Sequence, residues 1–174
     1  MQAVYELARN IKLLIFDVDG VLTDGSLFLG DDGQEYKAFH SLDGHGIKML
    51  KNSGVEIAII TGRTSKVVVH RAQNLGITHL YQGVHDKLEA FLHLTEKLGI
   101  HFEQCAFMGD DVVDLPAMRR CGLALTVPQA PDRVKQHAHY VSLKEGGHGA
   151  AREVCELIMQ AQDTLEAQLS VYLK

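Results

Sequence analysis

Several features that mark other classes of protein are missing from this 174-residue chain. The three cysteines lie far apart and form no CxxC pair, which argues against a disulfide framework or a thiolate metal site. Lysine and arginine are scattered without a basic run and the net charge is −5, so we expect no nucleic-acid partner. No stretch approaches the roughly 20 apolar residues of a membrane span, so we expect no membrane partner either.

Signals for export, repetition and histidine-metal binding are also missing. The opening residues, MQAVYELARNIK, have charged residues spread along them and lack the apolar centre of a secretion signal. From the odd number and wide spacing of the cysteines we expect a cytoplasmic protein. His137 and His139 are the closest histidine pair and have no third ligand at a suitable spacing. Without repeats, low-complexity segments or linkers, residues 1–174 are expected to form one domain.

Short apolar runs do alternate with segments of helical periodicity. Apolar runs bounded by turn signals are typical of strands buried on both faces of a sheet. The expected strands cover residues 13–16, 55–60, 79–81, 105–108, 123–127 and 140–143. The expected helices cover residues 3–10, 47–51 with Asp43 as N-cap, 65–74, 86–98, 131–136 and 150–161. This alternation predicts an α/β fold with a doubly wound, mostly parallel, Rossmann-like sheet.

A β-hairpin is expected directly after the first strand. Residues 26–29 and 34–39 flank the sequence GDDG, which is a strong turn signal. The hairpin is too small to form a separate cap domain. It is either a plain structural hairpin or a flap beside a site, and the pattern alone leaves both interpretations open.

The first strand breaks abruptly into Asp17-Val18-Asp19-Gly20. Side chains alternate along a strand, so Asp17 and Asp19 are expected to project the same way at the carboxyl edge of the sheet. Two nearby carboxylates repel each other unless a cation or a proton lies between them, and Mg²⁺ suits oxygen ligands. The alternative is that both residues simply cap a turn.

Two further strands also end in polar residues. The strand at residues 55–60 is followed by Thr61-Gly62-Arg63, and the strand at 105–108 is followed by Gly109-Asp110-Asp111, with Asp114 close behind. Strand ends in such a sheet meet at one edge, so these groups are expected to converge with Asp17. Thr61 and Asp114 could instead be ordinary helix caps.

These motifs, in the order DVDGVLTDG, IITGR, a lysine before a helix, and GDDVVD, resemble the haloacid dehalogenase superfamily of phosphotransferases. The resemblance spans about residues 11–127, and segments such as GGHGAAREVCELI extend it over nearly the whole chain. Because the chain has no cap insertion, it resembles the capless branch of the superfamily. The resemblance implies a Mg²⁺-dependent phosphomonoester hydrolase.

The resemblance also implies a role for each motif residue. Asp17 would be the nucleophile, and Asp19 would protonate the leaving group and then activate water. Asp17, the backbone carbonyl of Asp19, and Asp110 would hold Mg²⁺, while Asp111 and Asp114 would orient the water ligands of the ion and the lysine. Thr61 and Lys87 would bind the phosphoryl group. By position alone, Lys87 would be an exposed lysine at the start of a helix.

The implied substrate is a small sugar-acid phosphate, 3-deoxy-D-manno-octulosonate 8-phosphate, in lipopolysaccharide precursor synthesis. The resemblance assigns the sugar acid to a set of residues that includes arginines suited to a carboxylate. The set comprises Asp19, His40, Ser41, Leu42, Asp43, Gly44, Lys48, Arg63, Arg71 and Lys87. Leu42 stands where family members carry an arginine, so a nine-carbon keto acid phosphate of the sialic acid type is the competing substrate.

The resemblance further implies a homotetramer in which neighbouring subunits close an otherwise open site. We expect Gly146–Gly149 to release a tail that reaches the adjacent site, although these residues could equally form an ordinary loop before a helix. Two alternative functions are a non-catalytic regulatory module of the same fold and a phosphotransferase acting on another alcohol. The complete set of motif residues argues against the first, and the missing cap against the second.

Overall fold

A six-stranded parallel sheet forms the centre of the computed structural model, which describes all residues from Met1 to Lys174. The strand order is β5-β4-β1-β6-β7-β8, which confirms the predicted doubly wound α/β fold. The strands are β1 (Leu13–Phe16), β4 (Glu56–Ile60), β5 (His79–Tyr81), β6 (Cys105–Met108), β7 (Leu123–Thr126) and β8 (Tyr140–Val141).

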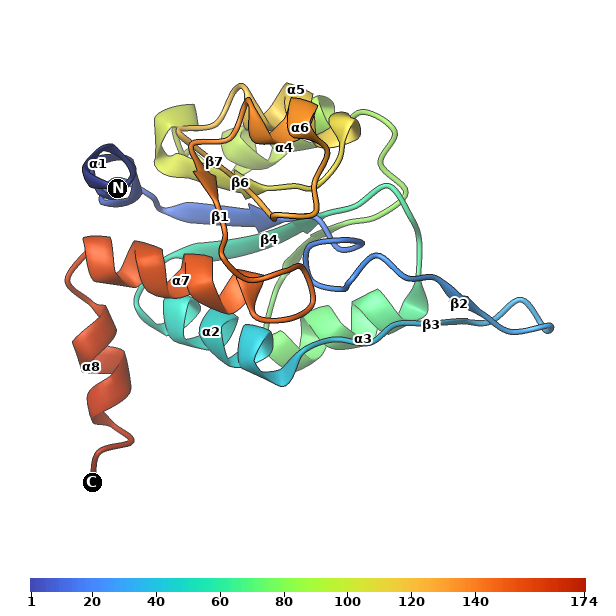
Figure 1. The fold of residues 1–174 in the computed structure, drawn as a ribbon, viewed down its shortest axis with the longest axis horizontal. Helices are drawn as coiled ribbons and strands as arrows, with labels where there is room; N and C mark the ends of the chain where they lie inside the picture. The colour runs from blue at the N-terminus through green and yellow to red at the C-terminus, as the bar shows by residue number, and fades with distance from the viewer.

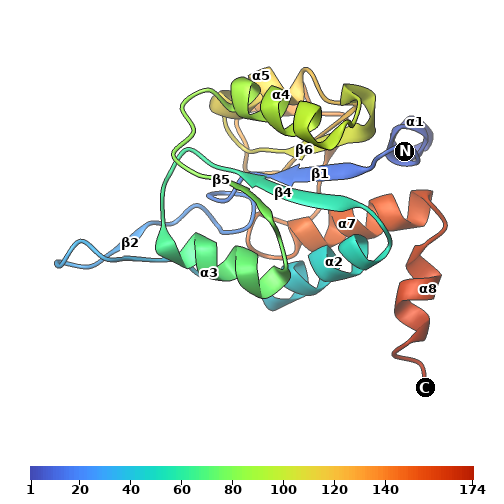
Figure 2. The same ribbon diagram turned by 180° about the vertical axis from the view of Figure 1, so that it is seen from behind.

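Helices cover both faces of the sheet. Helices α2, α3 and α7 lie on one face, and α4, α5 and α6 lie on the other, as two opposite views show (Figures 1 and 2). The helices are α1 (Gln2–Ala8), α2 (Ser41–Asn52), α3 (Lys66–Leu75), α4 (Lys87–Leu98), α5 (Leu115–Met118), α6 (Asp132–Lys135), α7 (Ala150–Ala161) and α8 (Leu165–Ser170). None of them is long and apolar enough to cross a membrane.

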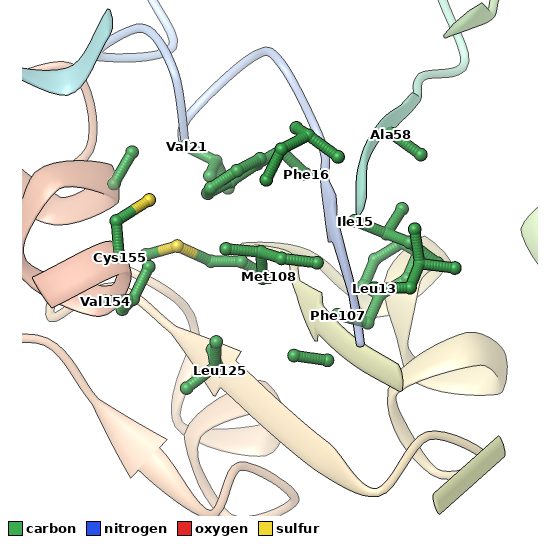
Figure 3. Close-up of a cluster of buried hydrophobic side chains, with 14 of the residues drawn as sticks. Leu13, Ile15, Phe16, Val21, Ala58, Phe107, Met108, Leu125, Val154 and Cys155 are labelled. Atoms are coloured by element: carbon green, nitrogen blue, oxygen red, sulfur yellow. The ribbon is translucent and has the colours of Figure 1, made fainter. Parts of the chain in front are cut away.

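The core lies on both sides of β1, because all four of its residues are buried. Leu13 and Ile15 lie with Phe107, while Phe16 lies with Met108 toward α7 (Figure 3). A strand covered on both faces has no polar side, which explains its continuous apolar sequence. The core thus fixes β1 rigidly beneath the acidic turn that follows it.

The register of the three central strands aligns their carboxyl ends. Phe16 of β1 pairs with Ile59 of β4 and with Met108 of β6. The next residue of β1, Asp17, continues the ladder by donating its backbone N–H to the Met108 carbonyl at 3.0 Å. The polar residues after these strands therefore share one edge of the sheet.

The predicted hairpin is present but shorter than its sequence pattern suggests. Strands β2 (Phe28–Leu29) and β3 (Glu35–Tyr36) pair antiparallel and extend away from the sheet at its carboxyl edge (Figure 1). The side chains of Phe28 and Leu29 are exposed. The hairpin therefore does not pack on the core, and packing does not lengthen its two strands.

One sequence-based expectation about a cap is wrong. Helix α2 begins at Ser41, and Asp43 lies inside its first turn rather than capping it. Residues 146–149 form a loop that leads directly into α7, with the Gly147 N–H donating to the Val21 carbonyl at 3.0 Å, and the expected reach of the following segment into an adjacent site stays a prediction. A Cβ on Gly146 would lie 1.8 Å from the Gly20 carbonyl oxygen, so this loop packs closely on the acidic turn.

Candidate active site

A cavity of about 400 Å³ opens at the carboxyl edge of the sheet. It lies where the ends of β1, β4 and β6 meet, as expected for an open α/β sheet. Its lining combines acidic, basic and hydroxyl side chains with few apolar ones. The lining residues are Asp17, Asp19, Gly25, Thr61, Gly62, Arg63, Val84, His85, Lys87, Asp110, Asp111 and Val113.

Three carboxylates meet at the base of this cavity. Asp17, Asp110 and Asp114 each offer an oxygen, and these oxygens lie within 4.8 Å of one another. The backbone permits this approach because Gly20 has a φ of +85° and no side chain; a Cβ there would lie 2.0 Å from Asp110 Oδ2. Gly109 is constrained in the same way, since its Cβ would lie 2.4 Å from the Asp114 side chain.

Lys87 is buried among these carboxylates at the start of α4. Its Nζ donates to Asp114 Oδ1 at 2.6 Å and lies 3.0 Å from Asp17 Oδ1. Asp114 also accepts the backbone N–H groups of Asp110 and Asp111 through Oδ2. Both oxygens of Asp114 are thus occupied by protein donors, whereas the Asp110 carboxylate accepts no hydrogen bond from the protein.

The single lysine does not neutralise the cluster. Burial, followed by repulsion from Asp114, raises the pKa of Asp17 to about 6 although Lys87 opposes the shift. Burial and repulsion from Asp17, Asp114 and Asp111 raise the pKa of Asp110 to about 7. Burial opposes the charge of Lys87, but its two carboxylate partners outweigh it and raise its pKa. The cluster therefore carries an excess of negative charge.

This excess charge fits a divalent cation bound by oxygen ligands. Asp17 and Asp110 have free oxygens facing the cavity, while Asp114 is committed to Lys87 and to backbone donors. A hard cation such as Mg²⁺ needs a few carboxylate ligands and keeps water or substrate oxygens in its remaining positions. The donor set thus suits such a cation beside a phosphate group.

Thr61, Asp19 and Arg63 lie around the mouth of the cavity. Thr61 follows β4 and is 2% exposed, and its hydroxyl makes no hydrogen bond within the protein. The Asp19 side chain is 21% exposed, and its Oδ2 lies 4.0 Å from Arg63 Nε. The catalytic and metal residues expected from the sequence are therefore brought together, and Asp111 joins them at the rim.

Most residues expected to contact the sugar acid do not line this cavity. Among the sugar-binding set, only Asp19, Arg63 and Lys87 do so. The remaining members lie on or beside α2 and α3, and their roles stay predictions. They are His40, Ser41, Leu42, Asp43, Gly44, Lys48 and Arg71.

Asp43 and Arg71 have clear structural partners instead. The Asp43 carboxylate is 2% exposed and accepts the backbone N–H groups of Gly149 at 3.3 Å and Arg152 at 2.8 Å. It thereby caps the N-terminus of α7 from a neighbouring helix. Arg71 donates to the His40 carbonyl at 3.1 Å and fixes the start of α2.

Sequence reasoning missed two charged residues of the hairpin. Lys37, directly after β3, donates to Asp19 Oδ1 and, at 2.9 Å, to Glu35. Burial opposes the charge of Lys37, but these carboxylates outweigh it and raise its pKa. Glu35 and Lys37 are two positions apart and share a side of the strand, which is the one signal that could have paired them.

A parallel α/β sheet with a buried lysine among carboxylates at its carboxyl edge is suited to an enzyme that acts on phosphate esters with a divalent cation, because phosphoryl transfer depends on positioning and charge neutralisation. The chain belongs to the haloacid dehalogenase-like hydrolases, since the model of that family matches residues 28–122. The resemblance seen in the motifs is thereby confirmed.

Similar proteins of known structure share the fold over its full length. A probable YrbI family phosphatase from Pseudomonas syringae pv. phaseolica 1448a is 52% identical, with a TM-score of 0.98 over 100% of this chain and 99% of its own. The 3-deoxy-D-manno-octulosonate 8-phosphate phosphatase of Moraxella catarrhalis, crystallised with magnesium, phosphate and KDO, is 46% identical, with a TM-score of 0.97 over 99% of each chain. The enzyme of the same name from Yersinia pestis is 50% identical over 163 residues, covering 94% of this chain and 87% of that protein.

Proposed function

We propose that this chain is a Mg²⁺-dependent phosphatase that hydrolyses 3-deoxy-D-manno-octulosonate 8-phosphate to the sugar acid and inorganic phosphate. The observation that carries the proposal is the contact of buried Lys87 with Asp17 in a cavity that also holds Asp110. This geometry leaves one Asp17 oxygen free beside a cation site and a phosphate site. The relatives with this activity supply the identity of the sugar acid.

In the first half of the reaction, Asp17 attacks the phosphorus of the substrate. A carboxylate oxygen of Asp17 forms a bond to phosphorus, and the bond from phosphorus to the sugar oxygen breaks. The electron pair stays on the sugar oxygen, which takes a proton from Asp19. The products of this half are the free sugar acid and an aspartyl-phosphate on Asp17.

In the second half, Asp19 acts in the opposite direction. Its carboxylate takes a proton from water as the water oxygen attacks phosphorus and the bond to Asp17 breaks. The phosphate leaves, while Asp17 returns as a carboxylate and Asp19 returns protonated. One residue serves both halves because the water attacks phosphorus from the side on which the sugar oxygen left, and Asp19 lines the cavity into which the substrate would bind.

Phosphoryl transfer depends chiefly on positioning and on charge neutralisation. Lys87 and the unpaired hydroxyl of Thr61 are placed to bind the phosphoryl oxygens. Mg²⁺ would be held by Asp17, Asp110 and the Asp19 carbonyl, and when bound it neutralises negative charge on the phosphate. Arg63 at the rim is suited to the carboxylate of the sugar acid.

We also propose a cytoplasmic homotetramer of one-domain subunits. The exposed side chains of Leu27, Phe28, Leu29 and Tyr36 on the hairpin support self-association. Three buried free cysteines suit a reducing compartment, and one continuous core supports the single domain. Sedimentation of Phe28→Glu tests the assembly: a variant that stays tetrameric contradicts the hairpin interface. If a dissociated variant retains full selectivity, closure of the site by neighbouring subunits is excluded.

Phosphate release from 3-deoxy-D-manno-octulosonate 8-phosphate tests the proposed function. We expect turnover with Mg²⁺, none in EDTA, and none in Asp17→Asn. Asp132→Asn, at an exposed position of α6 outside the cavity, serves as the matched control and is expected to retain activity. A nine-carbon keto acid phosphate is assayed in parallel, and faster turnover of that compound would contradict the proposed substrate. Metal-independent turnover would contradict the mechanism itself.

A further inference from the structure

Lys37 reaches from the hairpin into the active site. Its side chain is 1% exposed, although the hairpin itself extends into solvent. The ammonium group donates to Asp19 Oδ1 and to Glu35 Oε1. Burying a lysine is unfavourable unless its charge is paired, and here the Glu35 carboxylate pairs it while Asp19 Oδ1 accepts a further hydrogen bond.

The hydrogen bond from Lys37 is the only one that the Asp19 carboxylate accepts from the protein. A second cationic group, Arg63 Nε, lies 4.0 Å from Asp19 Oδ2, beyond hydrogen-bonding distance. Arg63 donates instead to Glu35, through Nη2 at 3.2 Å and Nε at 3.3 Å. The orientation of Asp19 therefore depends on Lys37, and Glu35 links Lys37 to Arg63.

The orientation of Asp19 matters because the same side chain must give a proton to the sugar oxygen and later take one from the attacking water. An acid or base works only when it lies within hydrogen-bonding distance of the proton it transfers. Lys37 occupies Oδ1, so Oδ2 is the oxygen left to face the cavity. A side chain free to rotate would spend much of its time turned away from the leaving group.

We propose that Lys37 is a positioning residue for proton transfer, and that it acts through Asp19 without touching the substrate. Glu35 supports it by balancing its charge and fixing its side chain. The inference rests on the proposed phosphatase function. It gives the hairpin a part in catalysis within its own subunit, separate from any part in assembly.

A double-mutant cycle on Lys37 and Asp19 tests this inference. We expect Lys37→Met to lower kcat by about 10- to 100-fold, with KM changed by no more than about twofold. In the Asp19→Asn background, Lys37→Met should cause no further loss, because the group it positions is already gone. Lys37→Arg should recover part of kcat, since its guanidinium can still donate to Asp19. Lys97→Met, in the last turn of α4, is the matched control and should behave as wild type.

Three outcomes would overturn the inference. Losses that add in the double variant would show that Lys37 acts independently of Asp19. A change mainly in KM would make it a substrate ligand. Unchanged kcat in Lys37→Met would make it a structural ion pair only. Thermal unfolding of each variant identifies any loss caused by misfolding, and Lys37→Arg keeps the test decisive in that case. Failure of the wild type to release phosphate from the sugar-acid phosphate is a distinct result that refutes the proposed function.

Discussion

Replacing Asp110 by asparagine should stabilise this protein in EDTA while abolishing its activity. Burial and the neighbouring carboxylates raise the pKa of Asp110 from 3.8 to about 7, so the folded protein resists ionising it. Because the pKa of Asp110 is higher in the folded protein than in the unfolded chain, the protonated carboxyl contributes fully to the free energy of unfolding only below its ordinary pKa of 3.8. That contribution is lost as the pH rises through about 7. Asparagine is neutral at every pH and avoids this loss.

The size of the effect follows from the same pKa values. The difference between 3.8 and about 7 corresponds to about 4 kcal/mol for a fully buried group. Water in the open cavity screens Asp110, so we expect about 1–2 kcal/mol at about pH 8 and about a third of that at about pH 5. No hydrogen bond is lost in the variant, because the carboxylate accepts none from the protein.

Urea unfolding in EDTA at both pH values measures this difference, with Asp31→Asn as the exposed control. Adding Mg²⁺ should stabilise the wild type and have little effect on Asp110→Asn, because binding to the folded state alone raises the free energy of unfolding. If Asp110→Asn is no more stable than wild type at about pH 8, electrostatic repulsion in the carboxylate cluster is disproved.

Three further predictions concern Lys87, the cation ligands and the capping residue Asp43. Lys87→Met should lower the free energy of unfolding by about 3–5 kcal/mol in urea, because it leaves buried carboxylates unpaired; a loss below about 1 kcal/mol would contradict the described burial. The Kd for Mg²⁺, measured by calorimetry, should rise as the pH falls through about 7 and then about 6, because protons compete with the ion for Asp110 and Asp17. A Kd that does not change with pH would exclude Asp110 and Asp17 as ligands of the ion. Asp43→Ala should cost about 1–3 kcal/mol in thermal unfolding by uncapping α7, with Asp43→Asn milder, and equal losses would argue against a capping role.

The sequence predicted the sheet well because each strand carries its own local signal. Runs such as Leu13–Phe16 are apolar throughout, which only a strand covered on both faces requires. The strand-end rule then placed Asp17 and Asp110 together, since parallel strands bring their carboxyl ends to one edge. Helix α8 was not predicted as a separate element, because only Leu165 and Leu169 pack against the core and both are only partly buried.

Long-range partners could not be predicted from local pattern. Asp43 has the sequence signature of a helix cap, yet it caps α7, whose first residue is more than a hundred positions away. Lys37 lies on an exposed hairpin, and only the path of the hairpin over the cavity brings it to Asp19. The same limit applies to the sugar-binding set, most of which the fold places outside the cavity of its own subunit.

The position of β1 has a consequence for biosynthesis. It leaves the ribosome before the other strands of its sheet, yet it occupies the middle of that sheet, where Leu13 pairs with both Glu56 and Cys105. Neither neighbour exists when β1 emerges, so this very apolar segment must wait for about half of the chain before both of its edges are covered. A ribosome-bound chain that ends before β6 should therefore bind chaperones through the uncovered β1. The active site can form only after β6 has been synthesised.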